Sequence, residues 1–328
     1  MRLLFVAPRY RPHVGGVERV VEALASRAAA LGHEVVVLAG EPGIDRPREE
    51  VAGGVWVVRW PVYSPGGAYH VPRRRGDLDA WLGRVGAEVV HIHGAHAVFT
   101  VYVGERAAGR ARVVFSPHYH GGGHTAFRDL LWRLYWRRAV ARVVESSDVV
   151  HVVSPVEAGW VLAHFPRVAG KLAVVPNGVE GDVFSYRWRG ADSGYAVYGG
   201  RLEGYKRLLE AADLVRGLGL RFVVVGEGPV GRRLAGLRGV EVRPFLPRGE
   251  FLDLVAGARY AVNLSLREAF SVFIAEALAM GVPSLVSDVV ARALGAVVAG
   301  RVGGALVATG APVKTWDELM PRFLKLYG

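Results

Sequence analysis

Two carboxylates flank an apolar segment where a packed helix has little use for them. In SLREAFSVFIAEALAMGVP (265–283), seven mostly apolar residues separate Glu268 from Glu276. An unpaired carboxylate is costly to bury, so both side chains either face water or bind something. The pattern predicts a strand that ends near Ser265, with Glu268 in the next loop. A helix should then begin near residues 270–271 and carry Glu276 one to two turns along.

The start of this helix offers free backbone N–H groups, which favour a phosphate. The residues predicted to bind it are Ala269, Phe270, Ser271 and Val272. Charged oxygen acceptors suit sugar hydroxyls, and each such hydrogen bond contributes about 1.5–3 kcal/mol. We therefore expect Glu268 to reach a sugar hydroxyl and Glu276 to accept from a ribose diol. The alternative is that the acids complement the helix dipole, which explains Glu268 better than Glu276.

Two cations follow a second glycine-rich strand end. In VYGGRLEGYKRLLEAADLV (197–215), Arg201 and Lys206 flank a tight turn into a helix. Cations complement a helix start poorly, but they suit an anion such as a diphosphate bound there. Two solvated surface charges are the alternative. In the following GEGPV turn, Gly226 and Gly228 could contact a nucleotide base or ribose, or could form a purely structural turn.

A third glycine-rich turn lies near the N-terminus. Gly15 and Gly16 stand between a strand and a helix that starts near Val17. Free N–H groups at the positive end of the helix dipole make this turn a candidate anion site, and the glycines let a ligand approach the backbone. A purely structural turn between a strand and a helix would show the same sequence pattern, so both interpretations stay open.

Histidines cluster at the ends of two further strands. The segments HIHGAH and SPHYHGGGH supply His91, His93, His96, His118, His120 and His124. They could ligate a metal, form hydrogen bonds to a ligand in a cleft, or be solvated loop residues. No acid near them completes a ligand set and there is no HExxH motif, which disfavours a metal hydrolase. His118 lies closest to the carboxyl end of its strand and is the strongest candidate for a hydrogen-bonding role.

Short apolar runs alternate with helical patterns and predict the elements that hold these groups. The predicted strands are 3–7, 34–39, 88–92, 112–116, 148–154, 171–175, 195–200, 221–228, 240–245, 259–265 and 283–288, and the first helix is 17–31. The pattern indicates an α/β protein with two doubly wound, Rossmann-like domains of parallel strands. In this class the ligand binds at the carboxyl ends of the strands, in a cleft between the domains. The predicted regions are a first domain (1–176), a linker (177–194), a second domain (195–312) and a terminal helical segment (313–328).

Composition narrows the class of protein. The chain of 328 residues has no cysteine, which excludes a disulfide framework and thiolate metal sites. The net charge of +11 favours anionic partners, although no nucleic-acid-binding module is recognisable. The first apolar run is too short for a signal peptide, and no apolar stretch is long enough to span a membrane, so we expect a cytoplasmic protein. The arginine-rich, Ala-, Gly- and Val-rich composition is a weak indication of a thermophilic source.

In this order, the motifs resemble the retaining, nucleotide-sugar-dependent glycosyltransferases of GT-B architecture, the "group 1" family. The resemblance covers most of the chain and rests on the glycine pair, HGAH, PHYHGGGHTAFR, PNGV, GGRLEGYK, GEGP and EAFSVFIAEALAMGVP. It implies that Arg201 and Lys206 bind the donor diphosphate and stabilise the leaving nucleotide. It further implies that Glu276 holds the ribose, while Glu268 and His118 face the transferred sugar. Gly15 and Gly16 would approach the donor phosphate or the acceptor.

The implied reaction moves a hexose from a UDP-, GDP- or ADP-sugar with retention of anomeric configuration. Fixed cations can stabilise a diphosphate leaving group, so neither a metal nor another cofactor is expected. The sequence departs from the family at Ser271, where glycine is common, at Glu180, where aspartate is common, and after residue 288, where the glycine-rich continuation is missing.

The sequence does not identify the acceptor, which could be a sugar, a lipid-linked molecule or a small molecule. The aromatic, arginine-rich segment 127–144 could lie against the inner face of an anionic membrane, or it could be a helix packed on the sheet. Three rival functions remain: a nucleotide-sugar epimerase of the same fold, a metal-dependent hydrolase, and a non-catalytic nucleotide-sugar-binding protein.

Overall fold

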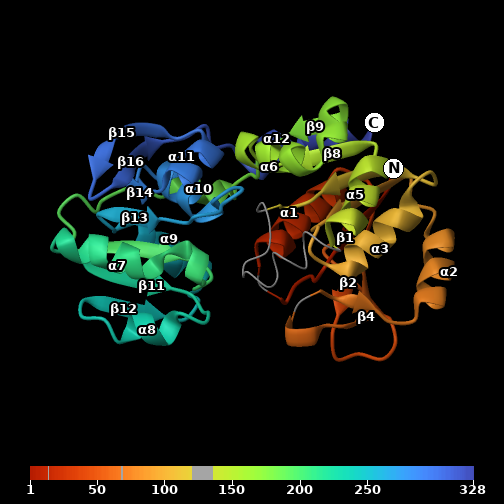
Figure 1. Ribbon diagram of the computed structural model, residues 1–328, viewed down its shortest axis with the longest axis horizontal. Helices are drawn as coiled ribbons and strands as arrows, with labels where there is room; N and C mark the ends of the chain where they lie inside the picture. Colours follow the sequence, from red (N-terminus) through yellow and green to blue (C-terminus); the bar gives the residue numbers. More distant parts are fainter. Residues whose placement is uncertain (14, 68, 120–135) are drawn as a thin grey trace. The chain divides into compact units, whose positions relative to one another are not determined.

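A computed structural model describes residues 1–13, 15–67, 69–119 and 136–328. The chain divides into two compact units (Figure 1). The first comprises Met1–Val153, Glu157–Pro176 and Asp317–Gly328, and the second comprises Ser154–Val156 and Asn177–Trp316. The segment that we predicted as a linker, 177–194, therefore belongs to the second unit. Residues 317–328 belong to the first.

The sheet of the first unit has the order β3-β4-β2-β1-β6-β7-β8-β9, and β5 pairs with β4. Its strands are β1 (Arg2–Ala7), β2 (Glu34–Glu41), β3 (Arg48–Ala52), β4 (Val55–Tyr63), β5 (Val71–Pro72), β6 (Val89–His93), β7 (Arg112–Ser116), β8 (Val149–Val152) and β9 (Leu172–Val174). The central strands are parallel, as predicted. The prediction missed β3, β4 and β5, and an all-parallel sheet is wrong, because β3 and β5 run antiparallel to β4.

Helices cover both faces of this sheet. They are α1 (Gly16–Ala30), α2 (Arg75–Val85), α3 (Val98–Ala107), α5 (Arg137–Ser146), α6 (Pro155–His164) and α12 (Trp316–Tyr327), with short 3₁₀ turns at η1 (Pro65–Gly67) and η3 (Pro166–Lys171). Leu4 and Val6 of β1 join the core that α2, α3, α5 and α6 cover. Side chains alternate along a strand, so Phe5 faces the other side, where its ring meets Tyr327 of α12.

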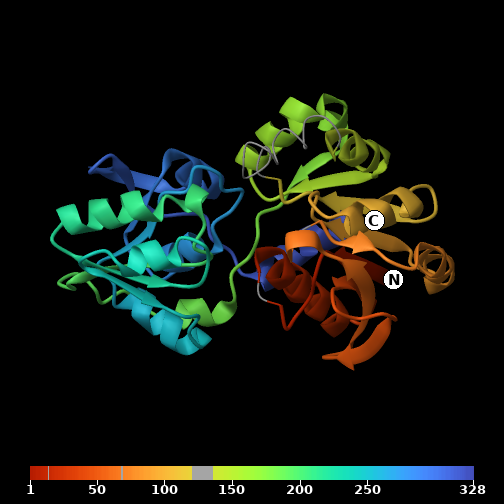
Figure 2. The same ribbon diagram turned by 60° about the horizontal axis from the view of Figure 1, so that its bottom comes forward.

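The helix α12 follows the second unit in sequence and returns to the first (Figure 2). Its first turn is held on α1, where Arg27 Nε donates to Asp317 Oδ1 over 2.8 Å. Near its end, Arg322 donates to the carbonyl oxygen of Val174, and the Tyr327 hydroxyl reaches the buried ring of His91. The helix thus closes one face of a sheet that was begun some 300 residues earlier in the chain, at Arg2.

The sheet of the second unit has the order β12-β11-β10-β13-β14-β16-β15. Its strands are β10 (Tyr195–Gly199), β11 (Arg221–Val225), β12 (Val240–Arg243), β13 (Tyr260–Asn263), β14 (Ser284–Val286), β15 (Val297–Val302) and β16 (Ala305–Gly310). The five strands predicted here are confirmed and parallel. The antiparallel pair β15–β16 was not predicted. It lies in the region after residue 288, where the sequence lacks the glycine-rich continuation of the family.

Helices again lie on both faces of this sheet. They are α7 (Leu208–Gly217), α8 (Gly231–Ala235), α9 (Arg248–Ala256), α10 (Val272–Ala279) and α11 (Asp288–Leu294), with 3₁₀ turns at η4 (Gly181–Ser185) and η5 (Gly204–Lys206). One core lies beneath α9, α10 and α11, and the other beneath α7 and α8. Each of the five strands predicted in this unit overruns the observed one at its carboxyl end, so the loops of this unit begin earlier than expected.

Segment 127–144 falls only partly among the described residues. Within its described part, Val140, Val143 and Val144 of α5 are buried in the core, while Arg137 and Arg142 are exposed. This is the pattern of a helix packed on a sheet. Among the described residues, no helix has the length and apolar character needed to cross a bilayer.

Candidate functional site

The loop between β13 and α10 is organised by one buried amide. Asn263, the last residue of β13, donates from Nδ2 to Ser271 Oγ (2.9 Å) and to Glu268 Oε2 (3.4 Å). Its Oδ1 accepts from the backbone N–H and the hydroxyl of Ser265, at 3.1 and 2.6 Å. Ser271 also caps the helix, because its Oγ accepts from Ile274 N. These bonds fix the path of the loop that presents Glu268.

Glu268 forms an ion pair with Lys206. The Lys206 Nζ atom lies 2.5 Å from Oε2, and the side chains are only 13% and 10% exposed. Burial by itself lowers the pKa of the Lys206 ammonium, but Glu268 and the phenols of Tyr205 and Tyr198 outweigh it and leave that pKa raised. The ammonium is therefore a fixed charge at neutral pH. It carries three N–H donors, so the pair with Glu268 leaves capacity for a ligand anion.

Two glycines in the loop after β11 allow it to pack closely against the loop that carries Lys206. Gly226 and Gly228 have φ values of +142° and +155°, and a Cβ at either would collide with the carbonyl of Gly200 or of Leu202. The backbone of the loop after β11 therefore lies directly against the loop after β10. Because no side chain is tolerated on this contact, the structure gives both glycines a packing role. Contact with a nucleotide remains a prediction for them.

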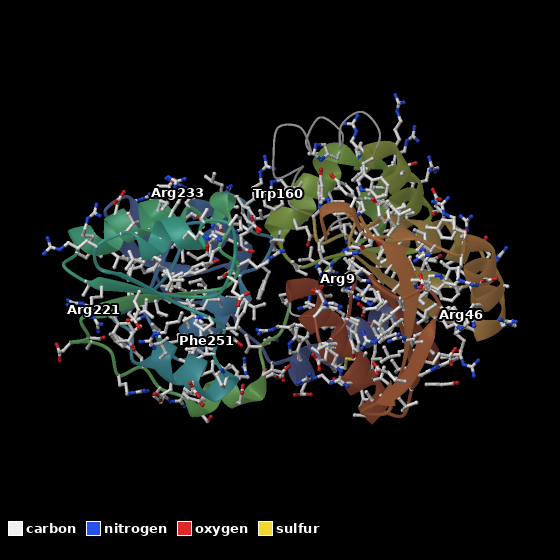
Figure 3. All side chains as sticks on the ribbon, turned by 90° about the horizontal axis from the view of Figure 1, so that it is seen from below. Arg9, Arg46, Trp160, Arg221, Arg233 and Phe251 are labelled. Carbon is white, nitrogen blue, oxygen red and sulfur yellow. The ribbon has the colours of Figure 1, made fainter. Side chains whose placement is uncertain are left out.

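The loop that carries Lys206 is held from two further sides. Leu266 N donates to the carbonyl oxygen of Tyr205 over 2.9 Å, which ties this loop to the one that presents Glu268. On the strand side, Phe251 of α9, labelled in Figure 3, packs so closely on β10 that a Cβ at Gly199 would collide with its ring. The glycine-rich end of β10 is thus fixed by packing before any ligand binds.

Glu276 lies one turn into α10, as predicted, and is also buried against a cation. Its Oε1 accepts from Arg248 Nη1 over 2.9 Å, and the carboxylate is 6% exposed. Arg248 stands at the start of α9 and also binds both carboxylate oxygens of Asp182 in η4, each over 2.7 Å. The hydrogen bond to Arg248 lowers the pKa of Asp182. One guanidinium therefore holds three segments together, and both glutamates of the opening motif bind cations rather than facing water.

The remaining predicted residues of this unit have different surroundings. Arg201 is exposed, and the Tyr198 hydroxyl donates to its carbonyl oxygen over 2.9 Å. Ala269 is buried, and Phe270 packs on the core beneath α10. The helix begins at Val272 with Ser271 as N-cap, one residue later than predicted. The N–H groups available to a phosphate thus belong to the first turn that starts at Val272.

In the first unit, Gly15 is the extended N-cap of α1 and Gly16 its first residue. A Cβ on Gly16 would meet nothing within 4 Å, so the backbone there is open to approach. A hydrogen bond holds His13, which lies shortly before this turn. His13 Nε2 lies 3.0 Å from Glu41, whose carboxylate also binds Arg59. This arrangement is compatible with an anion at the start of α1 but does not require one.

His118 follows β7 in a left-handed conformation with φ of +46°, which is strained for a residue with a side chain. Its neighbours hold it there. Gly94 N and Ala95 N donate to the carbonyl oxygens of Ser116 and Pro117, each over 2.8 Å. Such strain persists only where the surrounding structure fixes the backbone, as these bonds do.

On the other side of His118, the buried Glu157 accepts from the backbone N–H groups of Tyr119 and Val153, at 2.6 and 2.8 Å. Burial raises the pKa of Glu157 to about 7. The carboxylate thus anchors the chain directly after His118.

Of the other predicted histidines, His96 is half-buried, and the remaining four divide into two groups. His91 and His93 on β6 are fully buried, so the solvated-loop reading is wrong for them. His93 Nδ1 lies 3.0 Å from His118 Nε2. His120 and His124 lie outside the described residues. Among the described residues, no three His, Asp or Glu side chains lie close enough together to hold a metal ion.

The structure thus brings Lys206 to Glu268, and His118 to His93. Sequence reasoning missed Asn263, Arg248, Asp182 and Glu157. Asn263 could have been found, since a polar residue at the end of the apolar strand YAVN needs a partner. Arg248 gave no signal, because its partners lie 28 and 66 residues away in the chain.

Comparison with known proteins agrees with both units. Residues 14–183 match the family described as Glycosyltransferase Family 4, and residues 194–324 match Glycosyl transferases group 1. A phosphatidyl-myo-inositol mannosyltransferase of Propionibacterium freudenreichii is 27% identical over 320 residues, which cover 88% of this chain and 77% of that protein.

A GDP-mannose:cellobiosyl-diphosphopolyprenol alpha-mannosyltransferase of Xanthomonas campestris is 23% identical over 322 residues, 88% of this chain and 79% of the relative. Among solved structures, sucrose-phosphate synthase of Thermosynechococcus elongatus matches with a TM-score of 0.72 and 17% identity, over 99% of this chain and 90% of that one. The chain has the GT-B fold and belongs to the glycosyltransferases, with a Family 4 N-terminal region and a group 1 C-terminal region.

Proposed function

We propose that this glycosyltransferase moves mannose from GDP-mannose to a lipid acceptor that carries a phosphate. The transfer retains the anomeric configuration and needs no metal. The observation that carries the proposal is the buried Lys206–Glu268 pair, set beside the first turn of α10 with Glu276 one turn further on. The choice of sugar, nucleotide and acceptor rests on the relatives, which are named as mannosyltransferases of phosphatidylinositol and of a diphosphopolyprenol.

A diphosphate leaving group needs positive charge near the bridging oxygen as the bond to the sugar breaks. Lys206 supplies a fixed ammonium, and the first-turn N–H groups of α10 supply aligned dipoles. Arg201 is exposed, and no carboxylate among the described residues pairs with it, so it is available to a mobile phosphate. In this proposal Glu268 has two tasks. It holds Lys206 in place and presents its carboxylate to the sugar.

Glu276 would accept from the two ribose hydroxyls, with Arg248 fixing its orientation. The Nη1 atom of Arg248 lies 2.9 Å from Oε1 of this buried carboxylate and supplies the opposite charge beside it. A charged acceptor forms stronger hydrogen bonds to hydroxyls than a neutral one. His118, Gly15 and Gly16 belong to the first unit, and their roles toward sugar and phosphate rest on the family resemblance.

The first test is calorimetric titration with GDP, UDP and ADP, and with their mannose and glucose conjugates, in the presence of EDTA. We expect GDP and GDP-mannose to bind best, and Lys206→Ala and Glu276→Ala to weaken that binding. Lys314→Ala is the matched control, because Lys314 is an exposed lysine of the same unit. Binding that requires added metal, or that Lys206→Ala leaves unchanged, would contradict the proposed donor site.

The second test is product analysis. GDP-mannose would be incubated with the protein and vesicles that contain either phosphatidylinositol or a sugar-linked polyprenyl diphosphate. Formation of an α-mannosylated lipid and free GDP is expected, with the configuration read from the one-bond C1–H1 coupling of the mannose. A β-linked product would refute retention, and an altered nucleotide sugar without lipid product would indicate an epimerase instead.

A further inference from the structure

Four buried or half-buried histidines meet at the carboxyl edge of the first sheet, on β6, β8 and directly after β7. They are His91, His93, His118 and His151. Burial lowers the pKa of each of them, to about 3 for His118 and about 4 for His151. At neutral pH each ring is therefore uncharged, with one nitrogen that carries a proton and one that does not.

A chain of hydrogen bonds settles which nitrogen carries the proton in two of these rings. It starts at the carbonyl oxygen of Val175, which only accepts, so His151 Nε2 must donate to it over 2.8 Å. His151 Nδ1 then accepts from the hydroxyl of Ser116 at 2.6 Å. The Ser116 oxygen in turn accepts from His91 Nε2 at 2.7 Å. The last acceptor, His91 Nδ1, receives the proton of Tyr327 at 2.9 Å. Both histidines are thus protonated on Nε2.

The pair formed by His93 and His118 lies outside this chain. Their contacting atoms are His93 Nδ1 and His118 Nε2, 3.0 Å apart, and only one proton lies between them. The other nitrogen of His93, Nε2, is buried and has no hydrogen-bond partner among the described residues. If His118 were the donor, the proton of His93 would sit on this Nε2 as a buried N–H without an acceptor. Orphaned buried N–H groups are rarer and costlier than unsatisfied acceptors.

We propose that His93 is a positioning residue that donates from Nδ1 to Nε2 of His118 and thereby fixes the proton of His118 on Nδ1. No described residue pairs with that Nδ1, and the side chain of His118 is partly exposed. His118 therefore presents an uncharged N–H donor toward a ligand. The ligand atom that it fits is an acceptor oxygen, either of a sugar hydroxyl or of a phosphate. This last step rests on the proposed function, whereas the position of the proton does not.

The tautomers can be read directly in the full-length protein labelled with ¹⁵N-histidine, by long-range ¹H–¹⁵N correlation at neutral pH. The structure predicts an internal contrast: His91 and His151 protonated on Nε2, His93 and His118 on Nδ1. Single substitutions assign the signals. Observation of His118 protonated on Nε2 would overturn the proposal, whether or not the protein transfers sugar.

Two variants of His93 test its role. In His93→Phe the donor is lost, and the His118 proton should shift toward Nε2, as a mixture of both tautomers. In His93→Asn the amide nitrogen lies near the former Nδ1 and should keep the His118 proton on Nδ1. A folded His93→Phe protein in which His118 keeps its tautomer would show that His93 does not set it. If His93→Phe does not fold, the wild-type spectrum and His93→Asn still decide.

A measurement of transfer activity compares two replacements of His118 itself. Asparagine places its amide N–H near the former Nδ1 and glutamine places it near Nε2. We expect His118→Asn to retain at least about tenfold more kcat/KM than His118→Gln, the worth of one hydrogen bond to the ligand. Equal or reversed activities would contradict a ligand contact through Nδ1. If the wild-type protein transferred no sugar, the proposed function would be refuted, but the tautomer result would still stand.

Discussion

The two units bury polar groups at the carboxyl edges of their sheets in opposite ways. The second unit buries charges in pairs, Lys206 with Glu268 and Arg248 with Glu276. The first buries uncharged histidines that are linked by hydrogen bonds to Ser116, Tyr327 and a carbonyl oxygen. The two arrangements stabilise these groups by different means, opposite charge in one unit and matched donors and acceptors among His91, Ser116 and His151 in the other.

Under the proposed function, the difference suits two different tasks. A diphosphate that leaves with negative charge needs cations that cannot lose their protons, and the pairing with Glu268 keeps Lys206 protonated. A sugar hydroxyl needs a donor of fixed direction, and an uncharged ring held by its neighbours supplies one. Breaking one arrangement should therefore change binding and salt response, whereas breaking the other should change proton positions and acid stability.

The largest effect is expected from Lys206→Ala. Removal of the fixed ammonium should lower kcat/KM with GDP-mannose about a thousandfold, which corresponds to about 4 kcal/mol of transition-state stabilisation. It also leaves Glu268 buried without its cation. Steady-state kinetics on the variant and on Lys314→Ala measure the effect. A loss below tenfold would mean that the pair is structural and lies away from the reaction.

Acid should destabilise the first unit selectively. The pKa of His151 is about 4 in the folded chain and 6.5 for an ordinary exposed histidine, so the unfolded chain binds more protons between these pH values. The stabilisation is complete above pH 6.5 and is lost progressively as the pH falls toward 4, by about 3 kcal/mol for this residue. In the second unit, Lys206 has a raised pKa, so its contribution is complete below 10.5 and is lost at higher pH.

Hydrogen exchange at several pH values, normalised to intrinsic rates, would measure protection in peptides from β6 to β8 and from β13 to α10. The first set should lose protection below pH 6 and the second should not. His151→Gln should weaken the acid response, while replacement of the partly exposed His33 should leave it unchanged. Equal acid sensitivity in both units would remove the contrast.

A smaller effect is expected from Arg248→Ala. The variant leaves Glu276 buried without its cation, which should cost about 2 kcal/mol, since Arg248 itself is about one-third exposed. Exchange protection of α10 reports the loss, and GDP binding should weaken with it. Arg189→Ala removes an exposed pair with Asp253 and is the matched control, with an expected change below about 0.5 kcal/mol. If α10 is unaffected, Glu276 does not depend on Arg248.

The smallest effect is expected from Tyr327→Phe. The change removes the hydroxyl that donates to His91 Nδ1 and leaves that buried nitrogen unpaired, at about 1 kcal/mol. Thermal unfolding measures the loss, with the exposed Tyr63→Phe as control. Since His91 keeps its bond to Ser116, its proton should stay on Nε2. A shift of that proton would show that Tyr327, rather than the carbonyl of Val175, determines the proton positions along this series of hydrogen bonds.

The sequence predicts the parallel strands and the Gly-rich loops well, because buried strands are continuous apolar runs and turns need glycine. It fails for the antiparallel strands β3, β5, β15 and β16, whose residues are mostly exposed or half-buried. The exposed side of such a strand carries no apolar signal. The prediction therefore failed mainly at the edges of both sheets, although it also missed the mostly buried strand β4 (Val55–Tyr63), which lies one strand in from the edge.

The candidate site divides in the same way. Local spacing indicates Glu268, Glu276 and Lys206, because their motifs are continuous in the sequence. The partners of these residues come from remote segments: Asp182 and Arg248 meet Glu276 only after η4, α9 and α10 have packed together. Histidines could be singled out as a group, but their burial could not be predicted, because β6 is covered on both faces only once the unit has packed. Contacts between remote segments, rather than residue type, therefore determine this part of the site.

The return of α12 to the first unit has a consequence for the order in which the protein is made. The strands of that unit leave the ribosome early, but the helix that covers Phe5 and His91 is synthesised only after the whole second unit. The hydroxyl of Tyr327 must reach His91 across 236 residues of chain. Until then the part of the first sheet around Phe5 and His91 lacks its covering helix in the nascent protein, so the unit that begins first is completed last.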